Sequence, residues 1–175
     1  MEIHPFKSVK LFCAVLYNDK INPDDFIFLL SKVFSPADHK SPVFLFEHTD
    51  YYTEEMGANL HRILLSFEKL IRPESLAEIK HLTRIMENAF RIDGKRMINL
   101  DPGYLDYDKV VLASAKYGRQ KIALENGIYA DPTLEFTNHQ FCPYPWTFPD
   151  FSTNLYYNDL QIIRHIYKHQ LRIRP

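Results

Sequence analysis

The chain has 175 residues, of which 46% are hydrophobic and 25% are charged, a composition that suits one globular domain over residues 1–175. Its 13 Phe and 11 Tyr exclude a disordered chain, because so many large apolar side chains drive collapse into a core. A formal net charge of −1 gives no support to general binding of nucleic acid or of acidic membranes, so we expect neither as a partner.

The first predicted elements are a strand, a helix and a second strand. Residues 9–17 are mostly apolar on both faces, which is typical of a central strand. Asn22 can cap a helix and Pro23 suits its first position. Apolar residues then recur at helical spacing over residues 26–33. Residues 43–46 predict the second strand.

Two segments near that second strand are harder to assign. Residues 35–42 are expected to be a loop, because Ser-Pro pairs stand at both of its ends. In residues 60–71 the apolar side chains alternate as in a strand but also fit helical spacing. We favour a strand there, because a hairpin would pair it with residues 43–46 and the following segment already supplies a helix.

That helix has the clearest pattern of all. It begins at residues 73–74, presents apolar side chains on one face and ends at residues 93–94. Residues 97–100 predict a fourth strand. We expect residues 101–104 to end it in a type II turn, because proline presets the first central φ and glycine permits the second.

The rest of the chain predicts more strands and a final helix. Residues 137–157 are rich in proline and aromatic residues and are expected to be irregular, and a helix follows from Asn158. Pro132 interrupts one strand, which indicates an edge or a bulge. Three further strands are predicted, at residues 109–116, 120–124 and 128–136.

The predicted order of elements indicates the fold class. A strand-helix-strand-strand-helix-strand order followed by further strands predicts an α+β fold with a ferredoxin-like β-α-β-β-α-β core, additional antiparallel strands and a C-terminal helix. Cys13 and Cys142 form no paired motif, so we expect both to be reduced. No signal peptide and no membrane span is recognisable, which makes the cytoplasm the expected location.

Four motifs together resemble one protein family. They are TDYYTEEMG at residues 49–57, NLDPGY at 99–104, GIYADPTL at 127–134 and WTFPDF at 146–151. On these motifs, spread over nearly the whole chain, the sequence is similar to the prokaryotic domain-of-unknown-function family 4416. The resemblance implies no established activity and no assigned catalytic residue. The sequence also has no Gly-x4-Gly-Lys-Ser/Thr loop, which a P-loop nucleotide site requires.

The first candidate site is the acidic stretch at residues 47–55. Alternate residues of a strand share one face, so Asp50 and neighbouring polar groups could act as a base or hold a divalent metal. We take Asp50 and Glu55 as candidate catalytic residues or metal ligands, and Tyr51 as a ligand-binding residue. Solvated acids at a hairpin end are the alternative, and no known metal signature fits the spacing. The sequence specifies neither a metal nor a cofactor.

The second candidate set joins a strand end to nearby lysines. Asn99 and Asp101 place polar groups where a strand ends, and we take Asp101 as a third candidate base or metal ligand. Lys80 and Lys116 are candidate anion contacts, and Tyr104 would position a ligand. The alternatives are a turn aspartate that caps its own backbone, a solvated helix stripe and charge pairs across the sheet.

Two functions follow from these patterns. The first is a domain that binds a small anionic or phosphorylated ligand in a polar cleft, with or without metal-assisted or acid–base chemistry. The alternative is a non-catalytic protein-interaction or self-assembly module, in which residues 137–157 supply an aromatic surface and the basic final helix meets the acidic stretch of a second copy in a homo-oligomer.

Overall fold

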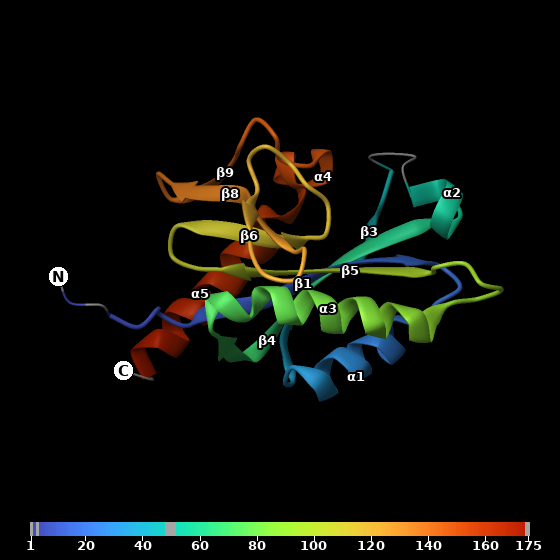
Figure 1. Cartoon of the computed structure of the whole chain (residues 1–175), viewed down its shortest axis with the longest axis horizontal. Helices are drawn as coiled ribbons and strands as arrows, with labels where there is room; N and C mark the ends of the chain where they lie inside the picture. Colours follow the sequence, from blue (N-terminus) through green and yellow to red (C-terminus); the bar gives the residue numbers. More distant parts are fainter. Residues whose placement is uncertain (1, 3, 48–51, 174–175) are drawn as a thin grey trace.

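The computed structural model describes residues 2, 4–47 and 52–173, in which helices pack on both faces of one antiparallel sheet (Figure 1). The strands are β1 (Val9–Asn18), β2 (Ala37–Lys40), β3 (Phe44–Leu45), β4 (Leu60–Ile71), β5 (Ile98–Leu105), β6 (Lys109–Ser114), β7 (Ile122–Ala123), β8 (Tyr129–Thr137) and β9 (Gln140–Pro143). The helices are α1 (Pro23–Val33), α2 (Thr53–Met56), α3 (Leu76–Glu87), α4 (Pro149–Ser152) and α5 (Tyr157–Ile173), with short 3₁₀ turns η2 (Pro73–Ser75), η3 (Asn88–Phe90) and η4 (Asn154–Tyr156).

The strand order confirms the α+β class. In the sheet the order is β2-β4-β1-β5-β6-β8-β7, with β3 also paired to β4 and β9 to β8. Each of these pairs is antiparallel. β1 lies between β4 and β5, as its apolar character on both faces predicts.

The side chains of β1 divide the core into two layers. Cys13 and Val15 pack in one apolar cluster with side chains of α1 and α3, whereas Phe12 and Ala14 pack in another with side chains of α5. Alternate residues of a strand point to opposite faces, so one strand serves both clusters. Figure 1 shows α1 and α3 on one face of the sheet and α5 crossing the other.

The predicted helix starts are confirmed, and so is the strand at residues 60–71. Asn22 caps α1 by accepting a hydrogen bond from the Asp24 backbone N–H at 3.1 Å, with Pro23 in the first position. β4 spans Leu60–Ile71 and pairs with β3 as the expected hairpin. The pairing of β6 with β8 shifts register beside Pro132, which is the expected bulge.

The predicted type II turn at residues 101–104 is wrong. β5 runs straight through it, and Pro102 pairs with Cys13 of β1. A Cβ atom on Gly103 would lie 2.5 Å from the Val111 carbonyl oxygen and 2.9 Å from Cε1 of Phe12. Glycine is therefore needed here because the backbone of β6 and a phenyl ring approach closely. Glycine inside a strand often marks such a close approach.

Two short strands lie where loops were expected. β2 falls inside residues 35–42 and pairs with β4, and β9 falls inside residues 137–157 and pairs with β8. Neither has the apolar alternation that marks a strand, because each is an edge strand whose pairing comes from the neighbouring strand. No helix in the described part of the chain is long and apolar enough to cross a membrane.

Candidate functional site

The candidate site opens where β5 and β6 separate. Among the described residues the two strands pair at three positions, the last of which joins Gly103 to Leu112. Beyond this pair β5 extends back to Ile98 and β6 extends on to Ser114, but the two strands no longer pair with each other. Figure 1 shows β5 extending well past the end of β6. The divergence leaves one edge of β5 without a neighbouring strand.

Side chains of α3 occupy that edge. The Leu100 backbone N–H donates to Glu87 Oε1 at 2.8 Å, and its carbonyl oxygen accepts a 2.8 Å hydrogen bond from Lys80 Nζ. Lys80 and Glu87 are both buried. Buried backbone groups require partners, and here two side chains supply what a strand supplies elsewhere. The polar stripe of α3 is therefore part of the interior of the fold, and its interpretation as solvated surface is wrong.

A pocket of about 570 Å³ lies in this divergence, between β4, β5, β6, β8, α3 and α4. Its volume falls within the range of small-molecule sites. The charged lining residues are Arg62, Lys80, Arg84, Arg96, Lys116, Lys121, Glu87, Asp101, Asp131 and Asp150. Apolar lining comes mainly from Phe46, Leu112, Phe148 and Phe151.

Asp101 is the centre of a polar network at one end of this pocket. Its Oδ1 accepts a hydrogen bond from Lys80 Nζ at 3.1 Å, and its Oδ2 accepts one from Asn99 Nδ2 at 2.6 Å. Arg62 Nη1 lies 3.5 Å from the same Oδ2. Burial opposes ionisation of Asp101, but Lys80 and Arg62 outweigh it and lower the pKa of this carboxyl. Asp101 is therefore a carboxylate that holds two cations in place.

Arg62 extends from β4 toward Asp101, and its side chain is only 4% exposed. It lies between two carboxylates, with Nη2 3.4 Å from Asp150 Oδ2, and its guanidinium carbon is 5.1 Å from the centre of the Phe46 ring. Burial opposes its charge, but Asp150 and Asp101 raise its pKa above the ordinary value. Among the described residues nothing accepts a hydrogen bond from Arg62 Nε. The guanidinium thus has donor capacity that the fold leaves unused.

Arg96 connects this end of the pocket to α2. Its guanidinium donates to Asn99 Oδ1 at 2.9 Å and to Glu55 Oε2 at 2.7 Å, and it lies 3.5 Å from Glu87 Oε2. Glu55 itself is exposed and does not line the pocket. The structure therefore places Glu55 outside the pocket lining, in contact with Arg96.

Two pocket groups have pKa values that burial raises. Burial, followed by the charge of Asp101, raises the pKa of Tyr52 to about 12, so its hydroxyl stays protonated at neutral pH. Burial also raises the pKa of Glu87 above its ordinary value, although the Leu100 N–H and the nearby cations oppose this shift. The pocket therefore combines a neutral hydroxyl with a carboxyl that protonates more readily than usual.

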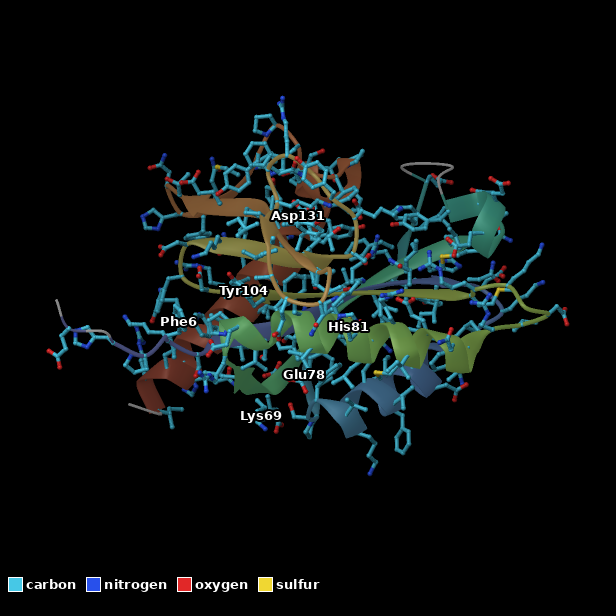
Figure 2. The ribbon with its side chains drawn as sticks, in the orientation of Figure 1. Phe6, Lys69, Glu78, His81, Tyr104 and Asp131 are labelled. Carbon is cyan, nitrogen blue, oxygen red and sulfur yellow. The ribbon has the colours of Figure 1, made fainter. Side chains whose placement is uncertain are left out.

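A second polar cluster lies across the pocket. It consists of Ser114 on β6, Asp131 on β8 and Lys121 just before β7. Lys121 Nζ donates to Ser114 Oγ at 2.8 Å and forms an ion pair with Asp131 Oδ2 at 3.1 Å. The ammonium also lies 6.0 Å from the centre of the Phe148 ring. Figure 2 shows Asp131 on the upper part of the sheet, away from α3, which carries the labelled His81. The pocket is thus bordered by two separate groups of buried charges.

The structure brings four of the candidate residues together. Lys80, Asn99, Asp101 and Lys116 line the pocket, although they come from three separate parts of the sequence. Tyr104 does not line it.

The side chain of Tyr104 packs instead against an apolar cluster that includes Leu76 and Val111, and Figure 2 shows it beside the N-terminal end of α3. Tyr104 was expected to position a ligand, but on the continuous strand β5 its side chain lies outside the pocket lining. Asp50 and Tyr51 lie outside the described residues.

Sequence reasoning missed several charged residues of the pocket. Arg62 and Asp131 each place a charge within a predicted strand, and a charge that such a strand buries is a signal that could have been used. Asp150 gives no comparable signal, because it follows a proline at the start of the four-residue helix α4. Across residues 2, 4–47 and 52–173, no three His, Cys, Asp or Glu side chains lie close enough together to hold a metal ion.

Comparisons with known proteins add the family. A family model described as Domain of unknown function (DUF4416) matches residues 7–167. No curated protein and no solved structure matches the chain.

Proposed function

The chain belongs to the DUF4416 family, whose description assigns no function, and we propose from the geometry of the pocket that this protein binds a small anionic ligand. The ligand occupies the space between the diverging strands β5 and β6. The two clusters of buried charges contact its polar groups, and the aromatic side chains contact its apolar part.

One observation carries the proposal: among the described residues, six cationic side chains but only four acidic ones line the pocket. Several of these charges are buried, so water screens them less than it screens surface charges. A pocket with a positive balance favours an anion, and arginine and lysine donors suit carboxylate or phosphate oxygens. Arg84 adds an exposed cation at the rim, and no residue in the described part of the chain forms an ion pair with it.

In this proposal Asp101 positions the cations that contact the ligand. Both of its oxygens already accept hydrogen bonds, and its pKa is lowered by Lys80 and Arg62 against the opposing effect of burial. A carboxylate of this kind is a weak base. Its role as a base or metal ligand therefore receives less support than a role in fixing Lys80 and Arg62.

The test compares thermal unfolding in the presence of inorganic phosphate, acetate and citrate for two matched variants. Arg84→Gln removes an exposed helical arginine at the pocket rim, and Arg172→Gln removes an exposed helical arginine on α5. We expect at least one anion to raise the melting temperature of the wild type and of Arg172→Gln more than that of Arg84→Gln. Equal shifts in all three proteins would mean that the anions bind elsewhere, and the proposal would be wrong.

A protein-interaction module remains the second candidate function. Trp146 and Phe148 are exposed, and the Trp146 ring stacks on Tyr144 with centres 5.0 Å apart. Exposed aromatic side chains are common at protein interfaces. Three other aromatic side chains of residues 137–157 pack inside the fold, however: Phe141, Phe151 and Tyr156 are buried in the cluster around α5. Light scattering that finds only monomers would count against self-assembly.

Two finer expectations join these proposals. We infer a ferredoxin-like core over residues 9–105, and the order β2-β4-β1-β5 with α1 and α3 packed on one face supports it. A cytoplasmic location stays a prediction from the sequence.

A further inference from the structure

Two lysines with mostly buried side chains line the pocket, and among the described residues each has one N–H without a protein acceptor. The Lys80 side chain is 8% exposed and the Lys121 side chain is 7% exposed. Lys80 Nζ donates to the Leu100 carbonyl oxygen and to Asp101, and Lys121 Nζ contacts Ser114 and Asp131. An ammonium has three N–H donors. In the described structure each ammonium therefore has one donor without a protein acceptor.

The sheet register separates the two lysines. Gly103 pairs with Leu112 and Leu112 pairs with Asp131, so Asp131 lies two strands across from β5. Asp101 is two residues from Gly103 on the same face of β5. With a strand spacing of about 4.8 Å and a rise of about 3.4 Å per residue, the Cα atoms of Asp101 and Asp131 are roughly 12 Å apart. Each aspartate holds one of the lysines, so the two ammonium groups belong to two distinct ends of the pocket.

Among the described residues, cationic side chains line the pocket at both of its ends. At the Lys80 end, three arginines add to the lysine, against Glu87, Asp101 and Asp150. At the Lys121 end, the charged side chains among the described lining residues are Lys116, Lys121 and Asp131. Glu55 offsets part of the charge of Arg96 from outside the pocket. An anionic group at either end meets at least one cationic donor that the paired carboxylates leave available.

The region between the two ends is apolar. Leu112 lies on β6 between the strands that carry Asp101 and Asp131, and it lines the pocket. Phe148 contacts Lys121, and Phe151 also lines the pocket. A ligand that reaches both lysines must therefore place an apolar spacer against these side chains.

From this arrangement we infer that the ligand carries an anionic group at each end of an apolar spacer. Such a ligand is an α,ω-dicarboxylate or a carboxylate that bears a phosphate or phosphonate at its other end. One anionic group contacts Lys80 and Arg62, and the other contacts Lys121. This inference rests on the proposed function and narrows the class of anion that it predicts.

The experiment measures binding by titration calorimetry with two series of probes. The first contains linear dicarboxylates from succinate to suberate, each compared with the monocarboxylate of the same carbon number. The second contains phosphonocarboxylates of matching lengths, which distinguish a carboxylate from a phosphoryl group at the second end. We expect one length to bind the wild type at least about 10-fold more tightly than its monocarboxylate, because hydrogen bonds to charged groups are worth this much or more.

Variants locate the two ends. Lys121→Met should reduce the advantage of the best diacid over its monoacid to about 2-fold or less, whereas Lys69→Met, at an exposed site outside the pocket, should leave it unchanged. Lys80→Met should have the same effect as Lys121→Met. If Lys80→Met does not fold, the wild-type series and Lys121→Met still decide the question.

The outcomes separate the two proposals. Monocarboxylates that bind as tightly as every diacid and every phosphonocarboxylate, with no effect of Lys121→Met, would overturn the two-ended ligand and leave the anion pocket standing. If no anion of either series binds the wild type, both proposals are wrong. A diacid preference that persists in Lys121→Met would also overturn the inference, because the second anionic group would then be held elsewhere.

Discussion

Lys80 Nζ lies 3.1 Å from Asp101 Oδ1 and 2.8 Å from the carbonyl oxygen of Leu100, so one ammonium joins α3 to β5. The contact forms where β5 has lost its neighbouring strand β6. The backbone of Leu100 needs partners there, and the side chains of Lys80 and Glu87 provide them. The same contact leaves the lysine at the wall of the pocket. Structural support and candidate ligand binding thus depend on one residue.

The first prediction concerns the charge of Asp101. Asp101→Asn removes the carboxylate that Lys80 and Arg62 share, and it leaves two buried cations with weaker compensation. Removal of one partner from a buried ion pair costs about 3 kcal/mol, and we expect a loss of this order in the free energy of unfolding, measured with urea. Asp108→Asn is the control, because Asp108 is exposed, and it should change stability by less than about 0.5 kcal/mol. Similar losses in both variants would contradict a special role for Asp101.

The second prediction is that the difference in stability between the wild type and Asp101→Asn depends on pH. Burial opposes the ionisation of Asp101, but Lys80 and Arg62 lower its pKa below the ordinary 3.8. Its contribution to stability is therefore complete above pH 3.8 and is lost as the pH falls through the lower value of the folded state. Urea midpoints of wild type and Asp101→Asn should differ at neutral pH and converge as the pH falls progressively below 3.8. A gap that does not narrow over this acid range would show that the charge of Asp101 is not responsible.

The third prediction is that ionisation of Glu87 lowers the stability of the folded protein, whereas ionisation of Asp101 raises it. Burial raises its pKa above 4.5, so the ionised form is less favourable in the folded protein than in the unfolded chain. The wild type should therefore lose stability relative to Glu87→Gln as the pH rises through 4.5 to the folded value, and the difference should then level off. The glutamine oxygen can still accept the Leu100 N–H, so this variant keeps the backbone contact. Urea midpoints of the two proteins over this interval test the sign, and a difference that moves the other way would refute it.

A further prediction concerns packing at Gly103. A methyl group there would lie 2.5 Å from the Val111 carbonyl oxygen, which is part of the neighbouring strand and cannot move aside easily. Gly103→Ala should therefore lower the free energy of unfolding by about 2 kcal/mol through overpacking, and thermal unfolding measures this loss. At Gly118 the nearest atoms belong to the side chains of Lys121 and Gln120 rather than to a backbone, and they lie at 3.0 Å or more, so Gly118→Ala serves as the control. We expect Gly118→Ala to be the more stable variant by a clear margin.

The last prediction concerns the attachment of α5 to the sheet. Lys10 of β1 is completely buried, and it donates to the Phe67 carbonyl oxygen at 2.7 Å and to Gln170 Oε1 at 3.0 Å while it pairs with Asp38. Lys10→Met fills a similar volume but leaves Asp38 without its cation. We expect a loss of about 3 kcal/mol in urea unfolding.

The exposed Lys69 provides the control for this change, and Lys69→Met should leave the urea midpoint unchanged within about 0.5 kcal/mol. Burial lowers the pKa of Lys10 despite the opposing effect of Asp38. The protein should therefore gain stability relative to Lys10→Met as the pH rises from the lowered value toward 10.5. A midpoint of Lys10→Met equal to that of the wild type would show that the buried contacts do not hold α5 in place.

The sequence by itself determined the elements whose signals are local. The apolar run of β1, the Asn22 cap of α1 and the periodic face of α3 predict these elements correctly, because strand alternation, capping and helical spacing depend on neighbouring residues. The α+β class follows from their order, and the four motifs identified the family. Lys80, Asn99, Asp101 and Lys116 were also recognised as candidates from residue type and position.

Only the tertiary structure decided what surrounds those residues. Residues 101–104 have the composition of a turn, yet a strand forms, because pairing with β1 and the close approach of β6 outweigh the local preference for a turn. Helical spacing places Lys80 on a polar stripe but cannot show that β5 and β6 separate next to it. That divergence depends on pairing between strands far apart in the chain. It buries the ammonium and brings Arg62, Lys121 and Asp131 to the same pocket.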